Sequence, residues 1–161
     1  MAMTINTDGI EELGAMLAEL EDKAYDVASE ALYEGAGIVG DAFTGAIGQI
    51  RTAPFKYAAG GRMRLASPEE KAALQGKSGI AKFNRDGDGV DTLIGISGAA
   101  GYASINGKPK AVRLIARSIN SGTSFMQRQP VFRKAKTVSQ GKAKAAIVSK
   151  ADELFKEITG G

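Results

Sequence analysis

The sequence predicts an α+β fold in which an antiparallel sheet of about four strands is packed by a long N-terminal helix and a C-terminal helix. Apolar residues recur at helical spacing over most of residues 8–50 and again over 130–158. Between them, short β-like runs separated by Gly- and Asn-containing turns fill residues 80–119. With 161 residues and 43% hydrophobic content, the chain is long enough for one core and too short to expect two. We therefore predict a single domain spanning residues 1–161.

The N-terminal segment predicts one helix, which begins near Thr7 or Asp8 and stops before Pro54. Glycines are concentrated in its second half, and each weakens a helix by up to about 1 kcal/mol relative to Ala. They are Gly35, Gly37, Gly40, Gly45 and Gly48. These glycines predict either a kink or a close contact that needs small residues.

A flexible insertion is expected at about residues 53–78. Small residues at 58–61 follow Pro54, and Ser67 with Pro68 predicts the start of a short helix. Two interpretations stay open for this segment, a partner-binding loop and a disordered surface insertion.

Strands are predicted at residues 80–83, 90–96, 102–105 and 111–119, with turns at 85–89 and 106–107. The last run alternates basic or polar with aliphatic residues, which is typical of a half-buried strand. Pro130 suits the first turn of the C-terminal helix, which is predicted to reach Ile158 with a bend or interruption at Gly141.

The chain has no Cys, His or Trp, and this absence excludes several function classes. Thiolate nucleophiles, imidazole bases and the usual zinc ligand sets are ruled out, so we predict no enzyme, no cofactor and no metal site. No apolar run approaches the roughly 20 residues that cross a bilayer, and the acidic N-terminus lacks the basic flank of a signal peptide. We expect synthesis in the cytoplasm and no membrane partner.

Three short motifs resemble ligand sites, but their context is wrong. Residues 35–40 match a dinucleotide fingerprint, yet a helical pattern precedes them where a strand is needed. Residues 76–78 resemble the end of a phosphate-binding loop without its first glycine. Residues 84–89 resemble half a calcium loop, but Gly95 replaces the bidentate acid. The favoured alternatives are helix packing, a chance match and a solvated hairpin turn.

Charge is distributed unevenly along the chain. Residues 1–50 carry ten acids and one base, whereas residues 111–161 carry ten bases and three acids. One interpretation places an acidic helix beside a basic half within one fold. The other places acidic and basic faces on opposite sides of the subunit, which would favour head-to-tail ring assembly.

The most specific stretch of the sequence runs from Gly122 to Ala135 and reads GTSFMQRQPVFRKA. It resembles the signature of the tail-completion or head-to-tail joining proteins of long-tailed phages, a neck-protein family that reads roughly GTSxMPAxPFLRPA. The matching positions are Gly122, Thr123, Ser124, Met126, Pro130, Arg133 and Ala135, with Phe132 in place of another large apolar residue. Gln127, Arg128 and Lys134 depart from the family's Pro, Ala and Pro. Weaker matches are a short strand at Ile5 leading into a Leu-rich helix, and residues 61–65 after Pro54.

The resemblance implies a non-enzymatic structural virion protein of the neck, which completes the head-proximal end of the tail and joins it to the head. It implies a ring, a hexamer by family analogy, as a connector between the head-closure or adaptor proteins and the tail terminator or tail tube protein. Non-specific contact with DNA in the channel is a further expectation. The interface candidates are Gly122, Thr123, Phe125, Met126, Arg128, Pro130, Phe132 and Arg133. Phe125 and Met126 are expected to contact partners, or alternatively to cover the sheet edge.

The basic residues of the C-terminal half leave a second function open, that of a small basic nucleic-acid-binding protein. Aromatic residues that could stack on bases are nearly absent among them. This alternative predicts salt-sensitive DNA affinity. Its candidate residues are Lys108, Lys110, Arg113, Arg117, Arg128, Arg133, Lys134, Lys136, Lys142 and Lys144.

Overall fold

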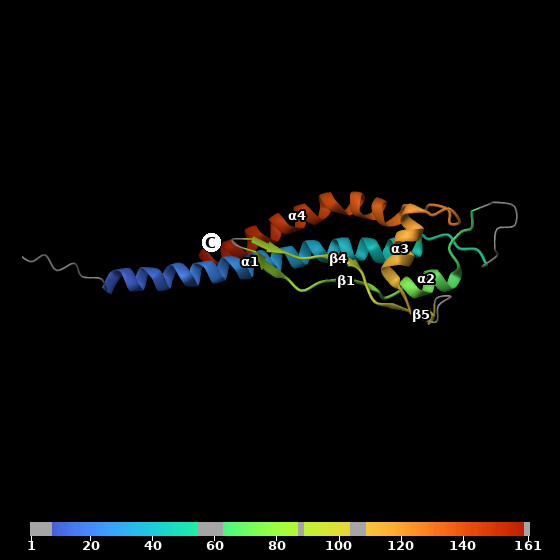
Figure 1. Ribbon diagram of the computed structural model, residues 1–161. Coiled ribbons are helices and arrows are strands. Elements are labelled where there is room, and N and C mark those ends of the chain that lie inside the picture. Colours follow the sequence, from blue (N-terminus) through green and yellow to red (C-terminus); the bar gives the residue numbers. More distant parts are fainter. Residues whose placement is uncertain (1–7, 55–62, 87–88, 104–108, 160–161) are drawn as a thin grey trace, which may run out of the picture.

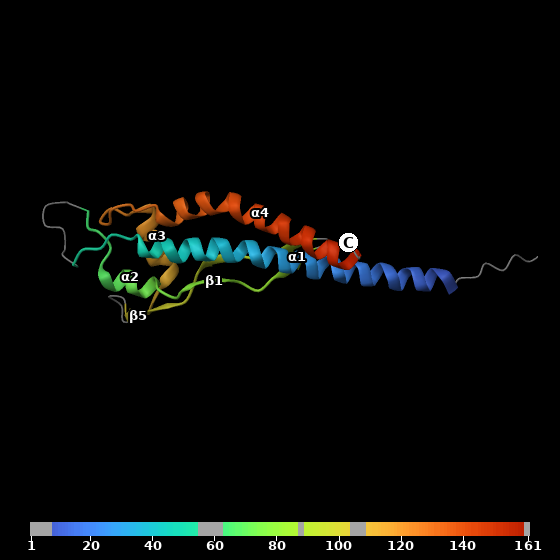
Figure 2. The same ribbon diagram turned by 180° about the vertical axis from the view of Figure 1, so that it is seen from behind.

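The computed structural model describes residues 8–54, 63–86, 89–103 and 109–159 (Figure 1). Two long helices, α1 (Asp8–Gly48) and α4 (Val131–Thr159), lie antiparallel and side by side in both views (Figures 1 and 2). The shorter helices α2 (Pro68–Leu74) and α3 (Val112–Ser121) lie near the C-terminal end of α1. The predicted α+β class, with a long N-terminal and a C-terminal helix, is confirmed.

The strands form three separate antiparallel pairs. The pairs are β1 (Ser78–Ile80) with β4 (Ile94–Ile96), β2 (Asn84–Asp86) with β3 (Gly89–Asp91), and β5 (Ala99–Ala103) with β6 (Pro109–Ala111). The expected sheet of about four strands is therefore divided into two-stranded pieces. Each strand has only three to five residues, and the three pairs are not joined into one sheet in the part of the chain that the structure describes.

The strand predicted at 111–119 is wrong, because these residues form α3 after Ala111. The buried residues of α3 follow i, i+3, i+4 and i+7 spacing, which places them on one helix face. They are Val112, Ile115, Ala116 and Ile119. This stripe spans eight residues of a ten-residue helix, so it outweighs the short polar and aliphatic alternation that resembles a strand.

The glycines of α1 do not interrupt the helix, and one of them allows a close helix contact. A Cβ atom at Gly35 would clash with Cγ1 of Ile147 and would lie 3.0 Å from the carbonyl oxygen of Ala143, both on α4. The other four glycines of this segment have open space around the same position. The fingerprint-like residues 35–40 thus lie inside a helix. Helix α4 also continues through Gly141, and Figure 1 shows it bowed over α1.

Part of the segment expected as a flexible insertion belongs to the core. Ala66 and Leu74 are fully buried, and α2 begins with a capping box in which Ser67 and Glu70 exchange hydrogen bonds. The short helix predicted after Ser67 is confirmed. The rest of the expected insertion, residues 55–62, lies outside the described residues, as do the strand expected at Ile5 and the turn at 106–107.

The hydrophobic core lies at the C-terminal end of α1, where α1, α2, α3 and the start of α4 meet (Figure 1). Its residues come from every helix and from the loop before α4. They are Ala46, Ile47, Ile50, Ala66, Leu74, Ala100, Val112, Ile115, Ala116, Ile119, Met126 and Phe132. The core therefore holds the Gly122–Ala135 stretch in place.

Candidate interaction site

The loop between α3 and α4 begins at a position that requires glycine. Gly122 ends α3 with φ of 76°, a backbone conformation that side chains disfavour. A Cβ atom there would also lie 3.0 Å from Cβ of Arg128. The glycine of the motif is therefore explained by the turn that it forms and by the close approach of the returning chain.

A tight turn follows Gly122 and places the side chains of Phe125 and Met126 in different environments, one exposed and one buried. The N–H of Thr123 donates to the carbonyl of Met126 at 3.0 Å, and the Thr123 hydroxyl accepts from the N–H of Met126 at 3.1 Å. This turn leaves Phe125 59% exposed and buries Met126, which is 1% exposed. The expectation that Met126 contacts a partner needs correction, because its side chain fills the core of its own chain. Phe125 stays a candidate contact.

A segment before α2 pairs with this loop. The N–H of Arg64 donates to the carbonyl of Phe125 at 2.9 Å, and the N–H of Gln127 donates to the carbonyl of Arg64 at 2.8 Å. The Arg64 guanidinium lies 5.9 Å from the centre of the Phe125 ring. It also forms a two-pronged ion pair with Glu70, at 2.7 and 2.8 Å. Arg64 thus ties α2 to the loop that carries Phe125.

Glu70 is a buried carboxylate with several donors around it, and only 5% of the residue is exposed. Burial raises its pKa, but hydrogen bonds from Arg64 and from the N–H of Ser67, with the positive charges of Arg64 and Lys110, outweigh it. The net pKa lies below the ordinary value of 4.5. Neither Glu70 nor Arg64 was predicted as a site residue from the sequence, although the Ser67–Glu70 spacing of a capping box was a usable signal.

Gln129 fastens the end of the loop to the end of α1. Its Oε1 accepts from the N–H of Arg51 at 2.8 Å, and its Nε2 donates to the carbonyl of Arg51 at 3.0 Å. Its own N–H donates to the carbonyl of Ile119 at 2.8 Å. Pro130 then precedes α4, and Oδ1 of Asn120 accepts from the N–H of Arg133 at 3.2 Å in the first turn of α4. The loop is therefore held at both ends.

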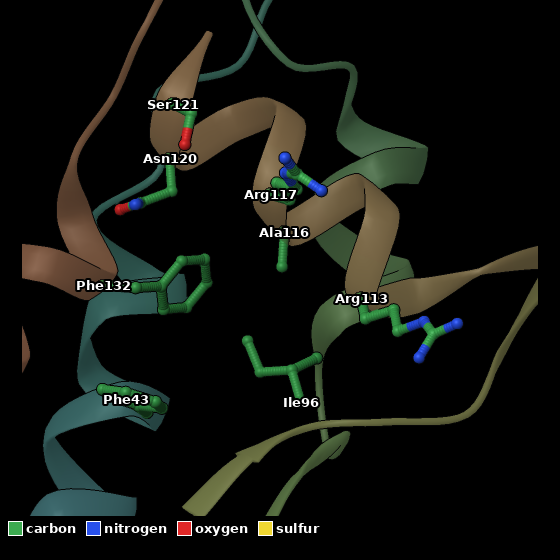
Figure 3. Close-up of a pocket in the computed structure, with 8 residues that line it drawn as sticks. All are labelled: Phe43, Ile96, Arg113, Ala116, Arg117, Asn120, Ser121 and Phe132. Atoms are coloured by element: carbon green, nitrogen blue, oxygen red, sulfur yellow. The ribbon is translucent and has the colours of Figure 1, made fainter.

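An open groove of about 320 Å³ lies between α1, α3 and the start of α4 (Figure 3). The rings of Phe43 and Phe132 meet edge to face, with centroids 5.8 Å apart. Arg113 and Arg117 line the groove from α3, and both are exposed. The eight lining residues are Phe43, Ile96, Arg113, Ala116, Arg117, Asn120, Ser121 and Phe132. The groove thus combines an apolar surface with two cationic side chains.

The predicted interface residues do not form one patch. Phe125, Arg128 and Arg133 are exposed, while the others are partly or fully buried. Phe132 alone among them lines the groove. Gly122, Thr123 and Pro130 shape the loop. Motif residues therefore serve mainly to build the junction between α3 and α4.

The basic residues proposed for nucleic-acid binding are spread over β6, which holds Lys110, the helices α3 and α4, and the loop between these helices, which holds Arg128. Arg113 and Arg117 lie on α3, five lie on α4, and Lys108 falls outside the described residues. Where the acidic and basic helices touch, Lys150 of α4 pairs with Glu30 of α1 at 3.3 Å. The hydrogen bond with Glu30 raises the pKa of Lys150, although burial opposes it. Acidic α1 and basic α4 thus lie side by side within one subunit, as the simpler interpretation of the charge distribution predicts.

Among the described residues, no group of three or more His, Cys, Asp or Glu side chains is placed to hold a metal ion. Residues 84–86 and 89–91, which include part of the calcium-loop resemblance, form the antiparallel strands β2 and β3. None of the helices in the described part of the chain is long and apolar enough to span a membrane.

Comparison with protein-family models, with curated proteins and with solved structures gave no significant match to this chain.

Proposed function

We propose that this chain is a structural protein of a tailed-phage neck, without catalytic activity, that assembles as a ring and joins the head-proximal end of the tail to the head-closure proteins. It would be made in the host cytoplasm and incorporated in the virion. The observation that carries this proposal is the resemblance of residues 122–135 to the neck signature. In support, these residues connect α3 to α4, hydrogen-bond to Arg51 and Asn120, and place Met126 and Phe132 in the core.

The exposed Phe125 supports the assembly role. It is a large apolar side chain, 59% exposed, on a turn whose backbone is fixed by Thr123 and Arg64. A fixed loop that presents an apolar side chain loses little conformational entropy on binding, which favours recognition.

The test of the proposal uses the phage whose genome encodes the chain. Deletion of the gene is expected to leave filled heads and complete tails that do not join, and mass spectrometry of purified wild-type virions is expected to detect the protein. A Phe125→Ser variant should restore joining poorly, while a variant at the exposed Leu93 should restore it fully. Normal infectious virions from the deletion strain would contradict the proposal.

A second candidate function is nucleic-acid binding, which the exposed cations of α3 and α4 favour. Five of them lie within 12 residues at the start of α4, namely Arg133, Lys134, Lys136, Lys142 and Lys144. Fluorescence anisotropy with short duplex DNA at increasing salt tests this candidate. Tight binding that falls steeply with salt would support it over the neck protein, and affinity that is absent at low salt would exclude it.

A further inference from the structure

Helix α1 is longer than the elements packed against it. Ile158, near the end of α4, lies with Lys23 and Val27 of α1 around a small hollow, and α4 ends at Thr159. Residues 8–20 of α1, here called the α1 overhang, therefore extend past α4. Figures 1 and 2 show none of the described elements beside this blue end of α1. At 1.5 Å per residue the overhang is about 20 Å long.

The overhang continues the apolar stripe that α4 covers elsewhere. Val27 and Ala31, which are 4% and 1% exposed, belong to a series spaced by three and four residues along α1. Extended towards the N-terminus, the series falls on four large aliphatic residues. They are Ile10, Leu13, Leu17 and Leu20. Such a stripe is typical of a helix that packs on a partner, and the described part of this chain provides none there.

The charges of the overhang indicate which kind of partner surface would be complementary to it. Every charged residue in it is acidic, and residues 1–22 contain no Lys or Arg. Two overhangs packed on each other would bring like charges together, which is unfavourable. An apolar surface bordered by cations is the complementary partner.

The groove of Figure 3 has this chemistry. Phe43, Ile96 and Phe132 supply its apolar surface, and Arg113 and Arg117 stand one helical turn apart on α3. None of its eight lining residues is acidic. The groove lies at the opposite end of the same rigid helix: the 30 positions between Leu13 and Phe43 correspond to about 45 Å. The overhang therefore cannot reach the groove of its own chain.

We propose that the α1 overhang of one copy docks in the groove between α1, α3 and α4 of a second copy. The apolar stripe of the overhang would face the aromatic surface, and the acidic sequence of the overhang would complement the charges of Arg113 and Arg117. Because the two surfaces differ, the contact is head-to-tail, and repetition closes a ring when the rotation between subunits permits. The inference rests on the self-assembly part of the proposed function and specifies its surfaces.

Sedimentation velocity of the full chain over a range of concentrations tests the contact. Wild-type protein is expected to form a discrete oligomer, and Arg113→Glu with Arg117→Glu is expected to raise its self-dissociation constant at least about tenfold. The matched control is Lys142→Glu with Lys144→Glu, which changes charge equally at exposed sites of α4 outside the groove. The control should assemble like wild type.

A mixture of two charge-reversed variants tests whether a variant alone fails to assemble because of its charge or because it is misfolded. Glu11→Arg, Glu12→Arg and Glu19→Arg together leave Asp8 as the single acid of the overhang and make it basic. This variant and the groove variant should therefore each be monomeric alone. Mixed in equal amounts, they should assemble alternately, because each overhang then meets a groove of opposite charge.

Two results would overturn the inference: wild-type protein that stays monomeric at every concentration, or groove variants that assemble like wild type. In the second case self-assembly occurs through other surfaces and the proposed function stands. Failure of the proposed function is seen separately, in virions that form normally without the gene.

Discussion

The two ends of the α1–α4 helix pair differ in how their apolar stripe is covered. At the C-terminal end of α1, helices α2 and α3 and the α3–α4 loop enclose a core in which Leu74, Ile115 and Ile119 are fully buried. At the N-terminal end, the same stripe continues on the overhang beyond the last turn of α4. One helix thus serves as a core element and as an extended arm.

Helix α1 is continuous across both ends, so secondary structure and tertiary burial are separate properties of this chain. Apolar surface removed from water stabilises by about 25 cal/mol per Å², so the enclosed end supplies most of the stability of the isolated subunit. The overhang supplies little until a partner covers it. Similar mutations should therefore change the free energy of unfolding by very different amounts at the two ends.

The largest loss of stability is expected from a mutation in the enclosed core. Leu74→Ala removes a fully buried side chain and leaves a cavity, so the free energy of unfolding should fall by about 2–5 kcal/mol. Urea denaturation measures this change. Leu93→Ala, at a site that is 75% exposed, is the control and should change it by less than about 0.5 kcal/mol. Equal losses of stability in the two variants would show that Leu74 is not part of the hydrophobic core.

Between the two ends, Gly35 tests the closeness of α1 and α4. Gly35→Ala places a methyl group against Ile147 and the Ala143 carbonyl, so we expect a loss of about 1–3 kcal/mol despite the better helix propensity of Ala. Gly37→Ala meets open space and should stabilise by about 0.5–1 kcal/mol. Thermal and urea denaturation of both variants give the comparison. Stabilisation by both changes would show that the helices are farther apart.

Gln129 tests the fastening of the loop. Gln129→Met keeps the volume and removes both side-chain hydrogen bonds to the backbone of Arg51, with an expected loss of about 1–2 kcal/mol. Gln127→Met, at an exposed position of the same loop, is the control. The prediction fails if the two variants unfold at the same urea concentration.

Glu70 gives the enclosed end a pH dependence. Because its pKa is lower folded than unfolded, its contribution to stability is complete above about pH 4.5 and is lost as the pH falls through the folded value. Glu70→Gln should therefore flatten the decline of stability between about pH 5 and 3. Glu69→Gln, at an exposed residue of the same turn, should keep the wild-type slope. Parallel curves for Glu70→Gln and wild type would contradict the assignment.

The smallest effect on stability is expected at the overhang. Leu17→Ser should change the free energy of unfolding of the monomer by less than about 0.5 kcal/mol, because no described element packs beside this part of α1. Urea denaturation at a concentration below self-assembly measures it. A loss as large as that of Leu74→Ala would show that the overhang is part of the folded core.

Much of the fold follows from local pattern. The apolar repeats predicted α1 and α4 with nearly correct ends, and Ser67 with Pro68 predicted the start of α2. Helix α3 was missed, because ten residues carry both a short alternation and a helical stripe and only packing selects between them. The four-stranded sheet was also too large, because strand length and pairing depend on contacts with α1 and α3.

At the candidate site, too, a local sequence pattern predicted only part of the structure. Their sequence marked residues 122–135 as a junction, and the structure places that junction between two helices. The sequence did not distinguish the exposed Phe125 from the buried Met126, since neighbouring residues in an irregular turn have no fixed period. It gave no signal for the groove, whose lining comes from four distant segments.

The α+β class, the two long helices, the lack of Cys and His, and the separation of acidic from basic residues could all be read from the amino-acid sequence. These properties follow from composition and from periodicities that act within one element. Only the tertiary structure decided that α1 outreaches α4, that Gly35 meets Ile147, and that Arg113 and Arg117 flank an aromatic groove. Each of these depends on contacts between residues far apart in the chain, which no local pattern encodes.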